Sequence, residues 1–178
     1  MKKSLLAVCA AFLAAAFGAP DARAQDELTR PVNLALFTPV AIFGEAYSIE
    51  GLRLSLIYGS NRNVTGLDVG LVNRATGDVT GLQYGLVGLV EGDFTGWQDN
   101  AVNIVGGKMT GLQTALYNGA ESAEGVLFGF VNITRSMNGL QVGVFNMTDN
   151  MEGLQIGILN VIRNKDKLPV LPIVNWSF

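Results

Sequence analysis

The stretch Gly139–Asn160, GLQVGVFNMTDNMEGLQIGILN, contains one eight-residue phrase twice. Gly-Leu-Gln-Val-Gly-Val-Phe-Asn returns, fourteen residues further on, as Gly-Leu-Gln-Ile-Gly-Ile-Leu-Asn. Self-similarity at a fixed step indicates a repeat architecture, in which each unit is one structural element packed on the next. Eight such units begin, at steps of 15 residues up to Gly111 and of 14 after it, at Gly51, Gly66, Gly81, Gly96, Gly111, Gly125, Gly139 and Gly153.

Each unit alternates two kinds of residue, and we number its places from the leading glycine. Places 2, 4 and 6 are apolar in most units, whereas places 1, 3 and 5 hold Gly, mostly Gln, and a small residue. Place 8 is Asn in six of the eight units. Alternation with a period of two is typical of a β-strand. With flanking strands expected at 31–43 and 168–178, the pattern predicts an all-β chain of about ten short strands.

Two architectures fit these strands. We expect first an antiparallel β-meander, closed as a small barrel of the outer-membrane type, because Gly-Asp and Gly-Gly joints resemble hairpin tips. The alternative is a β-solenoid of 14–15-residue coils, in which like residues stack and the Asn and Gln columns form ladders. Equal units with short joints oppose the barrel, which needs register stagger and usually has long outer loops.

The chain divides into an export signal and one domain. Two lysines, an apolar run and Ala22-Arg23-Ala24 predict a cleaved signal peptide at 1–24. Residues 25–178 then form a single β-repeat domain, with the repeat units at 51–167.

The composition after residue 24 excludes several functions. This part has no Cys and no His, which removes disulfides, the usual transition-metal sites and Cys- or His-based catalysis. It has nine Lys or Arg and fourteen Asp or Glu residues, a balance that does not favour nucleic acid. We expect no enzyme and no cofactor. Acidic residues at the joints are explained by turn chemistry, with calcium binding there as a weaker hypothesis.

The phrase GLQ-x-G, followed by two apolar residues and Asn, resembles a bacterial family of exported surface-repeat proteins. The flanks, VNLALF at 32–37 and LPVLPI at 168–173, match as well. The resemblance covers nearly the whole chain after residue 24 and implies an exported envelope or surface protein. It implies no activity that could be assigned to particular residues.

Two short segments are candidate sites. One unit carries Trp97, Gln98, Asp99 and Asn100, where Asp and Asn replace the usual apolar and small residues. We interpret it as a locally wet strand or as a polar binding patch beside an aromatic residue. Asp99 falls on the otherwise apolar face. The other segment is Trp176 and Phe178, a terminal aromatic pair that resembles the assembly signal of outer-membrane barrels.

The hypothesis for function is a non-enzymatic structural or interaction protein of the bacterial envelope. Its expected partners are the outer membrane and its assembly machinery, and its expected location is the outer membrane or cell surface. The alternatives are a periplasmic or surface-exposed solenoid for adhesion or scaffolding, and a small pore lined by the repeated Gln. A small hydrolase is the weakest hypothesis.

Overall fold

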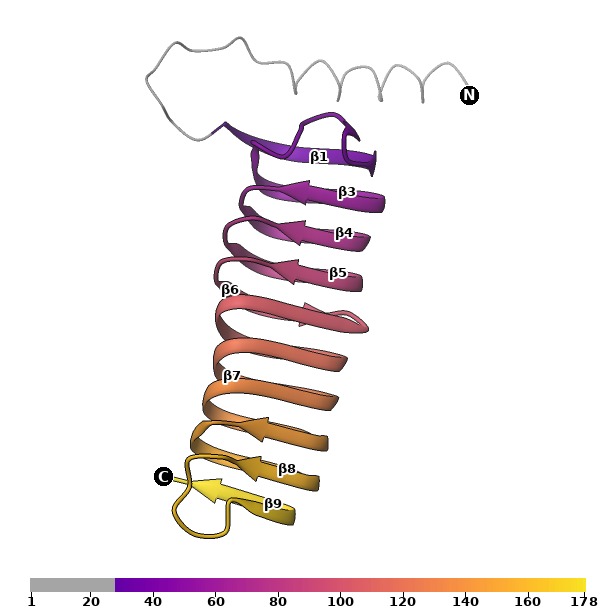
Figure 1. Ribbon diagram of the computed structural model, residues 1–178. Helices are drawn as coiled ribbons and strands as arrows, with labels where there is room; N and C mark the ends of the chain where they lie inside the picture. Colours follow the sequence, from indigo (N-terminus) through magenta and orange to yellow (C-terminus); the bar gives the residue numbers. More distant parts are fainter. Residues whose placement is uncertain (1–27) are drawn as a thin grey trace, which may run out of the picture.

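Strands of adjacent repeat units pair in parallel and in register. The computed structural model describes residues 28–178, so the expected signal at 1–24 lies outside the described residues. The chain winds as a β-solenoid, one unit per coil, into an elongated stack (Figure 1). Its strands are β1 (Thr29–Phe37), β2 (Val40–Ala41), β3 (Ser48–Asn61), β4 (Val64–Ala75), β5 (Val79–Val90), β6 (Phe94–Asp99), β7 (Val102–Thr148), β8 (Asn150–Ile162) and β9 (Val170–Ser177).

The all-β expectation is confirmed in this part of the chain, and the solenoid alternative fits it. Gly66 pairs with Gly81 and Leu67 with Leu82, and the same pairing of like residues joins β7 to β8. The antiparallel meander expected first is wrong, because adjacent units run in the same direction. Strand β7 continues through several coils without a break, and it includes the Gly106-Gly107 joint.

The joints are solenoid turns, and their acidic residues stack from coil to coil. Asp78 Oδ1 accepts a hydrogen bond from the backbone N–H of Asp93 at 2.8 Å. Asp93 Oδ1 accepts one from the N–H of Lys108 at 2.7 Å. The carboxylates therefore satisfy backbone donors of the next turn, which explains the Gly-Asp tips without hairpins.

The interior of the solenoid is lined by amide ladders. The Asn side chains of place 8 are fully buried, and each donates to the next at about 3 Å, from Asn103 through Asn118, Asn132 and Asn146 to Asn160. Gln98 donates to Gln83, and Gln113 donates to Gln98, at 2.8 and 2.6 Å. The expected Gln ladder is confirmed. It leaves the pore-lining interpretation without support, since these amides contact one another.

A buried ion pair begins the Gln column. The guanidinium of Arg53 donates two 2.6 Å hydrogen bonds to the carboxylate of Asp68, and both side chains are fully buried. Arg53 also donates to the carbonyl of Arg74, and Gln83 donates to Asp68. Bidentate geometry with extra hydrogen bonds is what makes a buried pair tolerable in a low dielectric.

A narrow apolar core lies beside the ladders. It stacks one side chain per coil in two columns, and its members include Val64, Val79, Phe94, Met109, Ala123, Met137 and Met151 on one side and Ala75, Val90, Val105 and Ile162 on the other. Leu127 also belongs to this core, although it stands in the Gln column. Inside each coil, amides and hydrocarbon therefore share the space.

The leading glycine of each unit is required by the stacking. All eight have φ between 119° and 140°, a conformation that side chains rarely adopt. A Cβ built on Gly139 would lie 2.1 Å from the carbonyl oxygen of Gly125, one coil below. No other residue fits this place, which explains why it is the one invariant place of the repeat.

Both ends of the solenoid are closed by strands of opposite direction. At the N-terminal end β2 pairs antiparallel with β1, and Asn33 exchanges two 3.1 Å hydrogen bonds with the backbone of Phe43. At the C-terminal end β9 pairs antiparallel with β8. Lys165 Nζ donates to Asn175 Oδ1 and lies 5.0 Å from the ring of Trp176. These segments cap the two ends of the solenoid.

Candidate interaction surface

The apolar side chains of places 2, 4 and 6 face outward. This outer sheet continues into β1, where Val32, Leu34 and Leu36 extend the same columns. The place-6 column is the most exposed: Leu116 is 67% exposed and Ile158 is 71% exposed. We call this sheet face the apolar wall; its exposed members in the repeat units are Leu54, Leu56, Leu67, Leu71, Tyr84, Leu86, Trp97, Leu116, Phe128, Phe130, Ile156 and Ile158.

A groove runs along the C-terminal half of the apolar wall. Its volume is about 670 Å³, and it lies between the columns of places 4 and 6, over the small residues of place 5. Phe128 and Phe130 stand on its two sides, and Gly129 and Gly143 form its floor. A second, smaller groove follows the same columns near Leu34 and Leu56. The grooves follow from the alternation of large and small residues along each strand.

The chain turns a corner between places 6 and 7, so two consecutive side chains point outward. The buried residues on either side of this corner are the Asn of place 8 and the Gln of place 3. Place 7 is apolar or aromatic in every unit, as in Val72, Tyr117 and Phe145. The apolar surface therefore continues from the wall, around this edge, onto the next side of the solenoid. We call the edge formed by places 6 and 7 the apolar edge.

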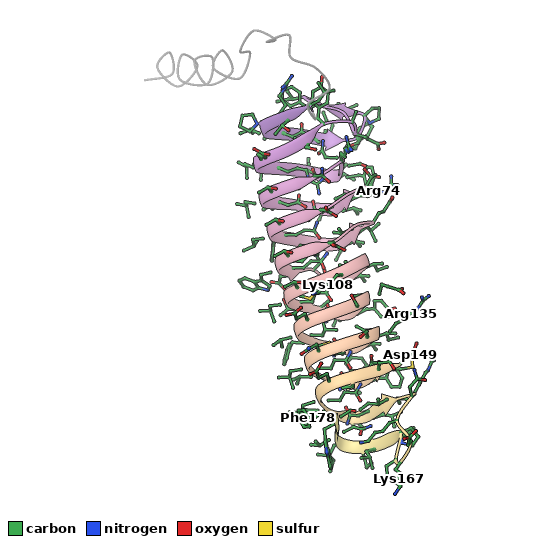
Figure 2. The ribbon with its side chains drawn as sticks, turned by 90° about the vertical axis from the view of Figure 1, so that its left-hand side faces the viewer. Arg74, Lys108, Arg135, Asp149, Lys167 and Phe178 are labelled. Atoms are coloured by element: carbon green, nitrogen blue, oxygen red, sulfur yellow. The ribbon has the colours of Figure 1, made fainter. Side chains whose placement is uncertain are left out.

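Charged side chains gather on the turns, away from the apolar edge. Figure 2 labels Arg74, Arg135 and Asp149 along one long side of the solenoid. Four ion pairs connect successive coils: Arg74–Glu91 and Lys108–Glu124 at 2.5 Å, Arg135–Glu121 at 2.6 Å and Arg163–Asp149 at 3.3 Å.

Two of these groups have shifted pKa values. The hydrogen bond from Lys108 holds the pKa of Glu124 below its ordinary value. Hydrogen bonds with Tyr58 and then Glu91 raise the pKa of Arg74. Both shifts favour the charged forms of these two groups.

The segment Trp97–Asn100 does not form one patch, because its side chains alternate between two faces. Trp97 and Asp99 point outward on the apolar wall, where Trp97 Nε1 donates to Thr114 Oγ1 at 3.2 Å and that hydroxyl donates to Asp99 at 2.5 Å. Gln98 and Asn100 point inward, and Gln98 belongs to the Gln ladder. The structure thus separates the proposed patch into a polar spot outside and two ladder residues inside. The expectation that Asp99 lies on the apolar face is confirmed.

Asn100 compensates for a residue missing one coil earlier. Place 8 is Gly88 in that coil, and a Cβ there would lie 2.6 Å from Asn100 Nδ2. Asn100 Nδ2 donates to Asn103 Oδ1 at 2.7 Å, as a place-8 Asn of the preceding coil would. The unusual Asn at place 5 therefore fills the space left by the unusual Gly at place 8. Both exceptions are visible in the sequence, but the repeat pattern alone does not connect them.

Trp176 and Phe178 lie at the C-terminal cap. Trp176 pairs with Leu154 and extends the place-2 column of the apolar wall, half exposed, while Phe178 is 93% exposed. Neither side chain takes part in the packing of the solenoid interior. Their role as an assembly signal stays a prediction.

Residues 28–178 contain no group of acidic residues that could hold a metal ion. Within the same range, no helix is long and apolar enough to cross a membrane. Comparison with known proteins found no matching family model, no matching curated protein and no matching solved structure. The apolar wall and its edge are therefore interpreted from their own geometry.

The sequence signal for this surface is a break in the alternation of each unit. Leu140, at place 2, stands partly exposed on the apolar wall. Two consecutive apolar places, 6 and 7, break the alternation just before the Asn of place 8. Such a break marks a corner, and a corner in every 14–15 residues indicates a coil rather than a hairpin.

Proposed function

We propose that this chain is an exported, non-enzymatic scaffold of the bacterial envelope that binds through its outer apolar surface. The observation that supports the proposal is an apolar wall that runs the length of the solenoid. Monomeric soluble proteins rarely expose a contiguous apolar patch of more than a few hundred Å². The wall has ten paired strands: β1, one from each of the eight repeat units, and β9. At a spacing of about 4.8 Å they make a face roughly 43 Å long, and the three outward places of each strand make it roughly 15 Å wide.

The solenoid suits a scaffold because its shape is set by repetition. Each coil contacts its neighbours in the same way, so the surface is rigid and regular along its length. The buried ladders hold the backbone without needing the outer side chains, which remain available for a partner. Export is supported by the signal expected at 1–24, and it directs the proposal to the envelope.

The test is fractionation of cells that express the full chain. We expect the protein with the envelope fraction, and we expect the triple variant Leu116→Gln, Phe130→Gln, Ile158→Gln to move to the soluble fraction. A matched variant on the charged turns, Glu121→Gln with Arg135→Gln, should stay with the envelope. Circular dichroism confirms that each variant is folded. A triple variant that remains with the envelope would contradict the proposal.

A further inference from the structure

The apolar edge has a shape that restricts its partner. Side chains of place 6 point outward on one side of the corner, and side chains of place 7 point outward on the other. Leu71 and Val72, or Phe130 and Val131, are such consecutive outward pairs. Neither place holds a charged residue in any of the eight units. A flat protein surface would cover one side of this corner and leave the other in water.

The paired charged side chains lie away from the apolar edge, where they would stay in water if that edge were bound to a surface. The four coil-to-coil ion pairs lie at places 9 to 14, along the turns. Arg74, Arg135 and Asp149 mark three of these pairs along one long side in Figure 2. The solenoid is therefore amphipathic along its whole length, in the way that an interfacial helix is amphipathic along its axis.

Resting on the proposed function, we propose that the apolar edge inserts into the hydrocarbon surface of a lipid bilayer. The solenoid lies with its long axis parallel to the membrane and its charged turns in water. A bilayer surrounds an inserted edge from both sides, so it covers places 6 and 7 together. The excess of acidic residues and the lack of a basic stripe exclude attraction to anionic lipid as the main driving force. The contact is therefore hydrophobic and independent of headgroup charge.

The position of Asp99 and Thr114 on the apolar wall agrees with a shallow insertion of the apolar edge. Asp99 stands at place 4, about 7 Å from place 6 along an extended strand. Apolar faces of interfacial elements are buried about 5–10 Å into the headgroup and acyl boundary. Asp99 and Thr114 would thus reach the polar boundary, where their hydrogen bond remains hydrated. In the same coil place 6 is Ala101, a small residue. The apolar edge is therefore least prominent in the coil that carries Asp99.

The test is flotation of the purified mature chain with phosphatidylcholine vesicles. We expect the wild type to float with the vesicles, in 0.1 M and in 2 M NaCl alike, and to sediment without them. Leu116→Gln, Phe130→Gln, Ile158→Gln should reduce the floated fraction at least tenfold. Glu121→Gln with Arg135→Gln is the matched control and should float as the wild type does.

Fluorescence gives a second measurement, with Phe130→Trp as the probe. Trp97 and Trp176 stand in the place-2 column, about 14 Å from place 6 along an extended strand. We therefore expect vesicles with brominated acyl chains to leave the wild-type emission unquenched and to quench the emission of Phe130→Trp. A chain that does not float but sediments as an oligomer, dissociated by the triple substitution, would overturn the lipid inference and leave the proposed function intact. A monomer that neither floats nor responds to the substitutions would overturn both.

Discussion

The interior of the solenoid holds many polar side chains and its outer wall holds apolar ones, which is the reverse of the usual distribution. Asn132 and Gln141 are fully buried, whereas Leu116 and Ile158 are mostly exposed. In ordinary proteins amides are mostly at the surface and leucines mostly inside. Parallel stacking explains the difference: an amide in one coil meets the same amide in the next, so each buried donor finds an acceptor. An apolar column gains no such partner from stacking and is left for an external one.

The largest expected effect comes from the backbone that allows this stacking. Gly139→Ala places a Cβ against the carbonyl oxygen of Gly125 and forces a disfavoured φ, so we expect a loss of about 3 kcal/mol or more of unfolding free energy. Gly44→Ala is the control, because a Cβ there meets no atom within 4 Å and Gly44 has no positive φ. Urea denaturation should show a loss that is smaller by at least about 1 kcal/mol in the control.

The reversed distribution of polar and apolar residues is tested by a reciprocal pair of substitutions. Asn132→Leu removes a donor and an acceptor from the Asn ladder and should cost about 2–4 kcal/mol. Leu116→Asn puts an amide on the apolar wall and should change the stability of the lipid-free chain by less than about 0.5 kcal/mol. The same denaturation measurement compares the two. Equal costs would mean that the inside and outside have been assigned wrongly.

Gly88 and Asn100 test whether a ladder position can be supplied from another place. Gly88→Asn alone collides with the side chains of Gln83 and Asn100, and Asn100→Gly alone leaves a polar cavity next to Gln83. We expect the double variant to be more stable than the sum of the single effects by about 1–3 kcal/mol. A double-mutant cycle measures this coupling. Additive effects would show that the two exceptions are independent.

Leu127 tests the one apolar break in the Gln ladder. Gln113 Oε1 has no hydrogen-bond partner among residues 28–178, because the next coil offers Leu127. Leu127→Gln supplies a donor to Gln113 with a side chain of similar length, and we expect a gain of about 0.5–1 kcal/mol. A loss of more than about 1 kcal/mol would show that Leu127 packing outweighs the restored ladder.

The smallest effect belongs to the exposed turns. Lys108→Met should raise the pKa of Glu124 toward its ordinary value of 4.5, as an NMR titration of the carboxyl group would show. The folded pKa lies below the unfolded one, so the stability from this pair is present above the unfolded pKa and is lost as the pH falls through the folded pKa. Salt should weaken the effect, because both groups are exposed. An unchanged pKa would remove the pair as its cause.

Period, strand content and ladder residues could all be derived from the sequence, because repetition exposes them directly. The direction of pairing could not. A parallel coil and an antiparallel hairpin have the same alternation along one strand, and Thr76-Gly77-Asp78 suits either kind of turn. The apolar wall also looks like the lipid face of a barrel, since both put apolar residues outside. The link between Gly88 and Asn100 needed the register, because these residues are neighbours only when the coils are stacked.

The reversed strands at the two ends of the solenoid have a consequence for aggregation. Identical strands stacked in parallel register, with amide ladders inside, have the geometry of an amyloid protofilament. Such a stack grows when an exposed parallel strand templates the next chain. Here β2 covers part of the first edge, and β9 presents an antiparallel strand whose Pro172 cannot donate a hydrogen bond. The solenoid therefore has the parallel stacking and amide ladders of a fibre, while its end strands oppose the addition of further chains.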